Sequence, residues 1–327
     1  MSESLDLGFI DCMSLYRTFN TYIEKGMGCL GFMFNIICLI VFVKLLKNPD
    51  SNNEMVKYLL LKSFVDAYVM LKSFLFIFFD CNYCDQYRFY ATGLFKLIFL
   101  IYFSYVAQFL SIFCELVAVF IRYATVAQKE FFLSRKIPFK VVTSFAFIYS
   151  LLFYSYKLFE NKIIKSMYKN YLKNTSYLIY KISSTEFGVS ETILKLDFVN
   201  SLIRDGILVL LIFVLNVLTC IKMKRLLKKK RLILANVRVN TQARKSESHL
   251  TIMILLTGFI AIIGHGFYFL FNTPSFILMV SECVYPIILF TYNLSYLINF
   301  FVYFFFNTMF RQCFLRLMCL INNSMIV

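Results

Sequence analysis

The sequence alternates between long apolar segments and short polar ones. A helix needs about 20 apolar residues to cross roughly 30 Å of hydrocarbon. Seven segments meet this requirement and predict membrane-spanning helices at Gly26–Leu46, Met55–Phe79, Gly93–Tyr123, Phe139–Leu158, Phe198–Met223, Leu250–Phe271 and Val284–Phe306. We therefore expect an all-α membrane protein with a seven-transmembrane helix bundle over residues 26–306. Residues 1–25 would form an extracellular N-terminus, and residues 307–327 a short amphipathic eighth helix and cytoplasmic tail.

The composition supports a chain embedded in a membrane. Hydrophobic residues make up 60% of its 327 positions and charged residues only 16%, whereas a soluble domain carries about 25% charged residues. Lys and Arg are more frequent in the segments that lie inside when the N-terminus lies outside, which predicts that orientation. Asn174, in an Asn-Thr-Ser glycosylation acceptor, then falls in an outer loop. The predicted location is the plasma membrane, with the C-terminus in the cytoplasm.

Two of the predicted loops carry patterns of their own. Lys222–Arg231 is a basic amphipathic extension of the fifth helix. It either stops transfer and contacts anionic membrane lipid, or presents a docking surface to an acidic cytosolic partner, and the two roles are compatible. In the outer loop, Ser176–Ser183 is rich in β-forming residues and roughly alternating, which predicts a short hairpin strand over the mouth of the bundle.

Polar side chains within the predicted spans are the candidate functional residues. Amide and charged groups at bilayer depth are costly unless they face other helices or water. Asn299 and Tyr303 are four residues apart, so they share one helix face. Side chains from four helices could form one hydrated cavity at mid-depth, namely Asn35, Asp66, Ser111, Ser295 and Asn299. The alternative for each of them is a structural role in helix packing.

Few residues within the predicted spans have side chains that could bind an ion or transfer a proton. Asp66 and Glu115 are its carboxylates, and a small cation or a proton would neutralise Asp66. Arg122 lies at the inner end of the third span, where its long stem can reach the interface. The two His of the chain, His249 and His265, both fall on the sixth helix, and no nucleotide-binding loop occurs. We therefore predict neither an enzyme nor a nucleic-acid partner.

The ten Cys do not form the pattern of a disulfide scaffold. Those that would face the oxidising outer side are Cys12, Cys81, Cys84 and Cys283. Cys313 and Cys319 follow the last span on the inner side, where they are either palmitoylation sites or free buried thiols.

Short motifs in four of the spans give the chain a family resemblance. They comprise Gly31 and Asn35 in the first span, Lys62 and Asp66 in the second, Ile121, Arg122 and Tyr123 in the third, and Asn299, Tyr303 and the following Phe310 in and after the seventh. In that order they resemble the GxxxN motif, the LxxxD motif with Lys for Leu, the DRY motif without its Asp, and the NPxxY motif with Phe for Pro. The chain from Gly26 to Cys319 thus resembles a rhodopsin-like (class A) G-protein-coupled receptor of a divergent invertebrate type, similar to nematode serpentine chemoreceptors and FMRFamide-like peptide receptors.

The resemblance implies a receptor that transmits an extracellular signal, a peptide or a small chemosensory molecule, to a heterotrimeric G protein. Ligand contacts are expected at the outer mouth, from Ser104, Tyr105, Gln108, His265, Tyr268 and Tyr292. Ser104 stands where amine receptors have Asp, which argues against an amine ligand. A polar switch is expected at Asn35, Asp66, Ser111, Ser295, Asn299 and Tyr303, with a sodium ion at Asp66 as the one bound cofactor. G-protein contacts are expected at Arg122, Tyr123, Lys228 and Arg231.

The chain also departs from the family. The outer end of the third span has no Cys for the usual disulfide, and the lost Asp before Arg122 implies raised basal activity. An alternative from another class is a seven-span transporter or channel that uses Asp66, Glu115 and Arg122 as an ion path. Transporters commonly show internal repeats and helices broken by Gly or Pro. This sequence has four Pro and no visible repeat, which favours the receptor.

Overall fold

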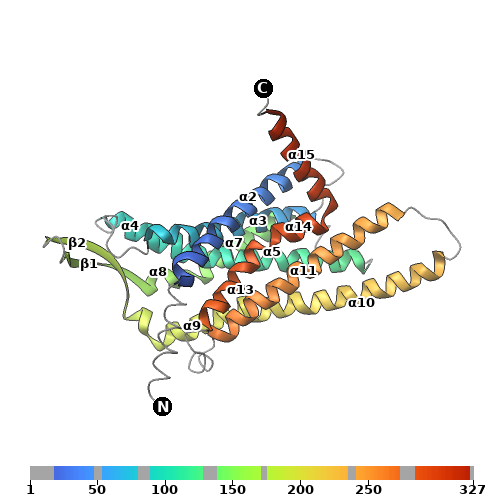
Figure 1. Ribbon diagram of the computed structural model, residues 1–327. Helices are drawn as coiled ribbons and strands as arrows, with labels where there is room; N and C mark the ends of the chain where they lie inside the picture. Colours follow the sequence, from blue (N-terminus) through green and yellow to red (C-terminus); the bar gives the residue numbers. More distant parts are fainter. Residues whose placement is uncertain are drawn as a thin grey trace, which may run out of the picture.

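The computed structural model describes residues 18–47, 54–79, 89–127, 138–170, 175–234, 241–272 and 284–324. Its long helices are α2 (Glu24–Lys47), α3 (Glu54–Phe79), α5 (Phe103–Val126), α7 (Phe139–Phe153), α10 (Leu208–Leu234), α11 (Thr241–Asn272), α13 (Tyr285–Leu297) and α15 (Thr308–Ser324). Shorter helical segments extend or join them: η1 (Phe19–Ile23), α4 (Tyr90–Phe95), η4 (Lys96–Tyr102), α8 (Tyr156–Glu160), η5 (Phe187–Val189), α9 (Glu191–Ser201), η6 (Leu202–Ile207) and α14 (Asn299–Phe306). Figure 1 shows most of these helices gathered into one bundle.

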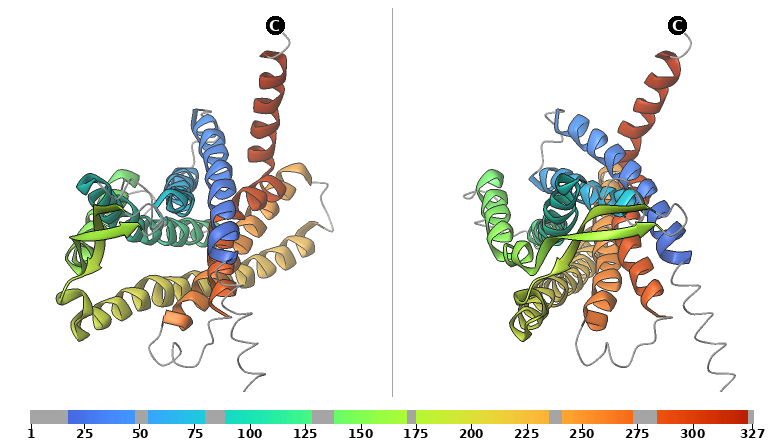
Figure 2. Two further views of the ribbon diagram at one scale, coloured as in Figure 1. Left: turned by 60° about the vertical axis from the view of Figure 1, so that its left-hand side comes forward. Right: turned by 90° about the vertical axis from the view of Figure 1, so that its left-hand side faces the viewer.

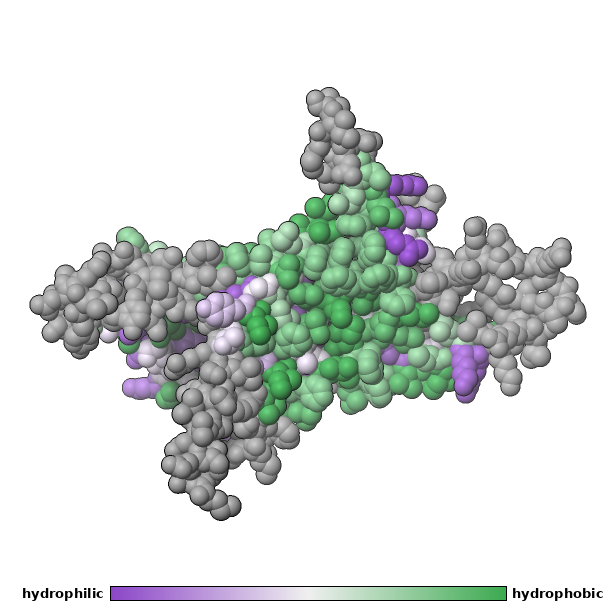
Figure 3. Space-filling view, viewed as in Figure 1, coloured by the Kyte–Doolittle hydropathy of each residue, from purple (hydrophilic) through white to green (hydrophobic). Residues whose placement is uncertain are grey.

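The helices define a membrane protein. Among the described residues, four helical segments are long and apolar enough to span a bilayer: Glu24–Lys47, Tyr90–Val126, Phe139–Glu160 and Glu191–Leu226. Helices α13 and α14 qualify together as a fifth, with a bend of 43° between them. On the face drawn in Figure 3, hydrophobic residues cover the middle of the bundle, and hydrophilic ones lie toward its two ends. A helical membrane protein is therefore confirmed, while the number of spans stays a prediction.

The two other predicted spans correspond to α3 and α11. Helix α3 has 26 residues, but Lys62, Asp66 and Lys72 interrupt its apolar sequence. In α11 the apolar part runs from Leu255 to Phe271, which is shorter than a full span. Both helices nevertheless pack within the bundle, α3 against α2 and α5, and α11 against α10 and α13.

Contacts between the helices close into a ring. The sequence of neighbours is α2–α3, α3–α5, α5–α10, α10–α11, α11–α13 and α13–α2, and α7 packs on α5 from outside this ring. Helices α2 and α3 approach so closely that a Cβ atom on Gly28 would lie 2.7 Å from the backbone nitrogen of Phe74. Only glycine fits this position, so the sequence specifies the close contact between α2 and α3.

A β-hairpin follows α8. Strand β1 (Asn161–Asn170) pairs antiparallel with β2 (Thr175–Ser184) along its whole length, which confirms the predicted strand. The hairpin packs against the start of α4, where the rings of Tyr90 and Tyr180 meet at 5.7 Å. Viewed from that end, it crosses in front of the bundle (Figure 2, right). Asn174, the predicted glycosylation residue, lies outside the described residues.

The fifth membrane helix begins earlier than predicted. The hydroxyl of Ser190 accepts a hydrogen bond from the backbone N–H of Ile193 at 3.4 Å and so caps α9. Segments α9, η6 and α10 then follow without a break from Glu191. The charged residues Arg204 and Asp205 lie within this helix, and their mutual pairing permits their burial.

Helix α15 leaves the bundle at a steep angle (Figure 1) and occupies the position of the predicted eighth helix. The side-chain oxygen of Asn307 accepts a hydrogen bond from the backbone N–H of Phe310 at 3.0 Å, which fixes its first turn. Phe310 is fully buried between Phe42 and Tyr303. This end of the bundle is therefore closed by an aromatic cluster that joins α2, α14 and α15.

Candidate functional site

A buried ion pair occupies the centre of the bundle. The Lys62 ammonium lies 2.7 Å from Asp66 Oδ2, one helical turn away on α3. Ser111 of α5 donates a hydrogen bond to Asp66 Oδ1, and Asn299 of α14 donates to Oδ2 at 3.0 Å. Asp66 is completely buried. Every oxygen of this carboxylate thus has a donor, and three predicted switch residues, Asp66, Ser111 and Asn299, meet around Lys62.

Glu115 extends this cluster to the sixth membrane helix. Its Oε2 lies 3.9 Å from Lys62 Nζ, and its Oε1 accepts a hydrogen bond from Thr257 of α11 at 2.7 Å. Lys62 therefore stands between two buried carboxylates. We call Lys62, Asp66, Ser111, Glu115, Thr257 and Asn299 the central network. It ties α3, α5, α11 and α14 together.

Within the described residues, the other predicted switch residues make no hydrogen bond to the central network. Asn35 donates to the backbone carbonyls of Gly31 and Tyr296. Ser295 donates to a carbonyl of its own helix. Tyr303 is buried among the aromatic rings near α15. The structure thus separates the six residues into a central group of three and three helix-packing positions.

The surroundings of Asp66 do not suit a bound sodium ion. The Lys62 ammonium already lies 2.7 Å from the Asp66 carboxylate. A sodium ion bound to the same carboxylate would lie close to this ammonium, and two positive charges so close together repel strongly in a buried site. The Lys62 ammonium also donates to Ser111 at 3.3 Å, so it fills the space among the polar groups. The predicted sodium ion stays an untested prediction, and no part of the mechanism below depends on it.

A second buried cluster lies toward the hairpin end. Arg204 binds the carboxylate of Asp205 through Nε and Nη2, at 2.6–3.1 Å. Its Nη1 donates to Gln108 of α5 at 2.8 Å. His265 of α11 places Nδ1 2.9 Å from Asp205 Oδ1. We call Arg204, Asp205, Gln108 and His265 the outer cluster.

Local helix geometry makes this cluster possible. Segment η6, which carries Arg204 and Asp205, is a π-helical stretch of six residues within a longer α-helix. Such wider turns shift the direction of side chains relative to an α-helix and recur at functional sites. Here both members of a neighbouring ion pair are buried in the bundle, with 3% and 1% exposure.

Aromatic residues join the outer cluster to the seventh membrane helix. The His265 ring packs edge-on against Tyr292 at 4.9 Å, and Tyr268 stacks on Tyr292 at 4.4 Å. Ser104 lies below Gln108 on α5 and is 3.4 Å from its amide nitrogen. The structure therefore brings five of the six predicted ligand residues into one connected region: Ser104, Gln108, His265, Tyr268 and Tyr292.

A cavity of about 310 Å³ adjoins the outer cluster. Its walls come from α5, the end of α7, α8, α9, η6 and α11, and comprise Tyr105, Tyr154, Tyr156, Leu194, Asp197, Phe198, Asn200, Ser201, Arg204 and Tyr268. Two predicted ligand residues, Tyr105 and Tyr268, line it directly. Arg204 is the point where cavity and outer cluster meet. The cavity-lining residues that were not predicted are mostly those of α9 and of the turn after α7.

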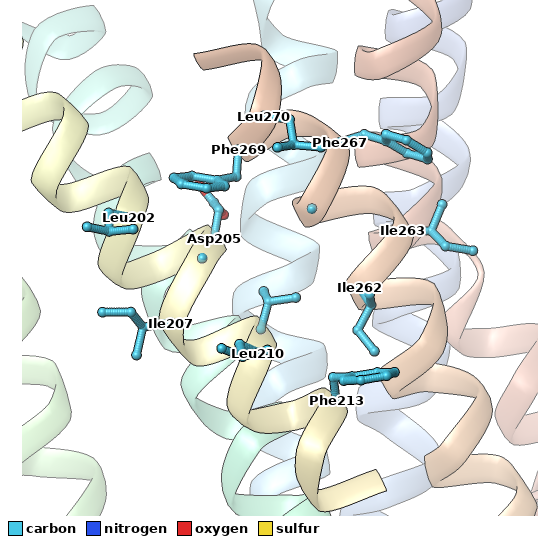
Figure 4. Close-up of a pocket in the computed structure, with 13 residues that line it drawn as sticks. Leu202, Asp205, Ile207, Leu210, Phe213, Ile262, Ile263, Phe267, Phe269 and Leu270 are labelled. Atoms are coloured by element: carbon cyan, nitrogen blue, oxygen red, sulfur yellow. The ribbon is translucent and has the colours of Figure 1, made fainter. Parts of the chain in front are cut away.

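A larger hollow of about 590 Å³ lies between η6–α10 and α11. Figure 4 shows Leu202, Ile207 and Leu210 from one wall and Ile262, Ile263 and Phe267 from the other. Ile207, Leu210 and Phe267 are all exposed on the outside of the bundle. This hollow is therefore an apolar groove that opens toward the lipid, and acyl chains suit its surface.

The predicted G-protein and lipid contacts lie toward the other end. Arg122 is nearly buried at 8% exposure, in the last turns of α5, with Tyr123 beside it. Lys228 and Arg231 belong to α10. Cys313 is half-buried and its thiol lies 3.9 Å from the Val41 carbonyl, while Cys319 is exposed. Cys319 is therefore the more accessible of the two thiols, and burial raises the pKa of the Cys313 thiol, which lowers its reactivity.

Lys62, Thr257, Arg204 and Asp205 of the two clusters, and Tyr154 beside the cavity, were not predicted as site residues. Lys62 and Asp66 carried a usable signal, because opposite charges four residues apart on a helix can pair. Arg204 and Asp205 interrupt an apolar run, which also signals a buried pair. Tyr154 carried no signal, because its role depends on which helices surround it.

A comparison of the sequence with protein-family models finds no match, and neither does a comparison with curated proteins.

Proposed function

We propose that this chain is a G-protein-coupled receptor of the plasma membrane, with the hairpin end outside and α15 at the cytoplasmic face. The single observation that carries this proposal is that two separate buried polar clusters join the same pair of helices, α5 and α11. The outer cluster borders a cavity, and the central network joins the two helices through Thr257 of α11 and Glu115 of α5. A ligand at the first can change the balance between two arrangements of the second.

The steps of this mechanism follow from the contacts. A ligand in the cavity touches Arg204, whose guanidinium already links Gln108 of α5 with Asp205, and through it His265 of α11. A shift of α11 relative to α5 then acts on the Glu115–Thr257 hydrogen bond two helical turns away. Release of that bond would let the inner part of α11 move away from α5 and admit a G protein beside Arg122, Tyr123 and the basic end of α10.

A transporter or channel is the second candidate, and the buried charges of the central network favour it. Buried charges in a membrane often mark an ion path. However, Lys62 pairs with Asp66 and Glu115 within the network, and Thr257 and Asn299 satisfy further carboxylate oxygens. A pathway needs groups that exchange partners with a passing ion. Here the Lys62 ammonium lies between both carboxylates, at 2.7 Å from Asp66 and 3.9 Å from Glu115, and this arrangement suits the holding of helices together better than the passage of an ion.

One expressing cell line can decide between the two functions. Activation of the major heterotrimeric G-protein classes is measured beside membrane conductance and solute uptake, against mock-transfected cells. The receptor proposal predicts G-protein activation above mock and no new flux. Flux without G-protein activation in any class would establish the second candidate instead.

The orientation needs its own measurement on intact cells. Epitope tags are inserted next to Asn174 and next to Arg231 and probed before and after permeabilisation. We expect antibody access at the first site without permeabilisation and at the second only after it. The reverse labelling would contradict the proposed topology and the receptor function with it.

A further inference from the structure

The cavity beside the outer cluster has an accessible carboxylate in its wall. Asp197 of α9 lines this cavity of about 310 Å³, and 38% of its side-chain surface is exposed. The Tyr156 hydroxyl donates to Oδ1 of this carboxylate at 2.7 Å, and the Lys157 ammonium lies 2.7 Å from the same oxygen. No group in the described part of the chain donates to Oδ2. This second oxygen is therefore an open hydrogen-bond acceptor on an accessible side chain of the cavity wall.

The charges around the cavity do not cancel. Lys157 lies 2.7 Å from Glu160 as well as from Asp197, so one cation stands between two carboxylates. Arg204, the cation of the cavity lining, is paired with Asp205 at 2.6 Å. One negative charge is thus left over among these groups. A positive charge on a ligand beside Asp197 would balance it, whereas a negative charge there would add repulsion.

The pairing with Lys157 leaves Asp197 free to take a second partner. Both carboxylates of this arrangement are partly exposed, Glu160 by 21% and Asp197 by 38% of the side-chain surface. An ion pair with an exposed carboxylate is screened by solvent and contributes little to stability. A ligand ammonium can therefore bind Oδ2 of Asp197 while Lys157 remains paired with Glu160.

The rest of the lining suits an organic cation of small size. Tyr105 and Tyr156 in the wall already attract an ammonium, because Lys157 Nζ lies 4.7 Å and 5.2 Å from the centres of their rings. Leu194 and Phe198 of α9 add apolar surface. The volume of about 310 Å³ stands at the lower limit of the range of roughly 300–1,000 Å³ that is usual for small-molecule sites. Size and lining therefore favour a small molecule with an apolar body over a peptide.

We propose that this cavity binds a small protonated primary amine whose ammonium donates a hydrogen bond to Asp197 Oδ2. Ser104 gives α5 no carboxylate with which to hold an amine, and Asp197 supplies one from α9 instead. The proposal names the ligand class of the receptor proposed above and rests on that function for its biological meaning. The binding equilibrium itself needs no G protein.

Three probes that share a phenyl ring test the charge requirement: benzylammonium, benzyl alcohol and benzoate. Binding to the full-length protein is measured at neutral pH by ligand-observed NMR, in nanodiscs of phosphatidylcholine, whose headgroup has no N–H donor. Empty nanodiscs serve as the blank. We expect benzylammonium to bind at least about tenfold more tightly than either other probe, as a charge-assisted hydrogen bond implies. Equal or tighter binding of the alcohol or the anion, or no binding of benzylammonium above the blank, would overturn the proposal.

A matched pair of variants on α9 tests the assigned carboxylate. Asp197→Asn removes its charge at nearly constant shape. Glu191→Gln makes the same kind of change at a side chain that is 80% exposed, pairs with Lys195 and does not line the cavity. We expect about a tenfold loss of benzylammonium affinity in the first variant and none in the second. Unchanged affinity in Asp197→Asn would refute the assignment.

Lys157→Met separates a binding role of Asp197 from a purely structural one. This change removes the internal ammonium that shares Asp197 with the ligand. We expect the preference for benzylammonium over benzyl alcohol to rise about three- to tenfold, because the carboxylate loses a competing cation. A structural role alone would leave this preference unchanged, and an unchanged or lower preference would contradict the proposal.

The binding and signalling assays fail independently. Selective benzylammonium binding without G-protein activation in cells would leave the ligand class standing and remove the receptor function. G-protein activation without selective benzylammonium binding would do the opposite.

Discussion

The central network and the outer cluster contain similar groups but suit different roles. Each buries a cation on one helix beside a carboxylate, and each reaches α5 and α11. In the central network Lys62 stands between two carboxylates, and the polar groups bond mainly to one another. In the outer cluster Arg204 has a single carboxylate and lines a cavity. A cluster whose cation lies between two buried carboxylates suits the holding of helices together, whereas a cluster that borders a cavity suits ligand binding.

The largest effect should come from Asp205→Asn. Removal of this charge leaves Arg204 buried without a counter-ion, which costs about 3–5 kcal/mol. Asp66→Asn should cost less, about 1–2 kcal/mol, because Glu115 remains near Lys62 as a second carboxylate. Melting followed by circular dichroism in detergent should rank wild type, Asp66→Asn and Asp205→Asn in falling order of melting temperature. The opposite order for the two variants would contradict the contrast between the clusters.

An intermediate effect is expected from Lys62→Met. This change leaves Asp66 and Glu115 facing each other without a cation, although Ser111 and Asn299 still donate to Asp66. We expect a loss of about 2–3 kcal/mol, seen as a lower melting temperature.

The same variant tests the role of Lys62 as an internal cation. The wild-type melting temperature should be the same in sodium and in a bulky organic cation at equal ionic strength, because the site already holds a positive charge. Lys62→Met should become more stable in sodium. A sodium effect in the wild type that is lost in Lys62→Met would show that the ion binds despite the ammonium.

The smallest effect on stability should come from Tyr154→Phe. Its hydroxyl has no partner in the described structure, so its removal should change the free energy of unfolding by less than about 0.5 kcal/mol or stabilise the protein. The melting temperature should match that of Tyr149→Phe. A clear loss of stability in Tyr154→Phe alone would show that the hydroxyl has a structural bonding partner.

The sequence predicted the membrane helices well and the polar sites only in part. Length and hydropathy suffice for α2 and α10, because burial in lipid depends on the apolar segment itself. The fifth span was predicted to begin at Phe198, so the first turns of α9, from Glu191, were missed. Gln108 and His265 were predicted to lie close together. They are linked through Arg204 and Asp205, and this link depends on the π-helical turn of η6, which the sequence pattern does not predict.

The most direct test of the account is the effect of Thr257→Val on G-protein activation. This change removes the hydrogen bond to Glu115 at nearly constant volume. Thr219→Val is the matched control, because the buried Thr219 hydroxyl donates to the Leu215 carbonyl of its own helix and, within the described residues, to no other helix. Nucleotide exchange on purified G proteins is measured with wild type and both variants in nanodiscs, without ligand. We predict about three- to tenfold faster exchange with Thr257→Val than with wild type, as loss of one hydrogen bond implies, and no change with Thr219→Val. Equal exchange with all three, at the rate of empty nanodiscs, would contradict the account.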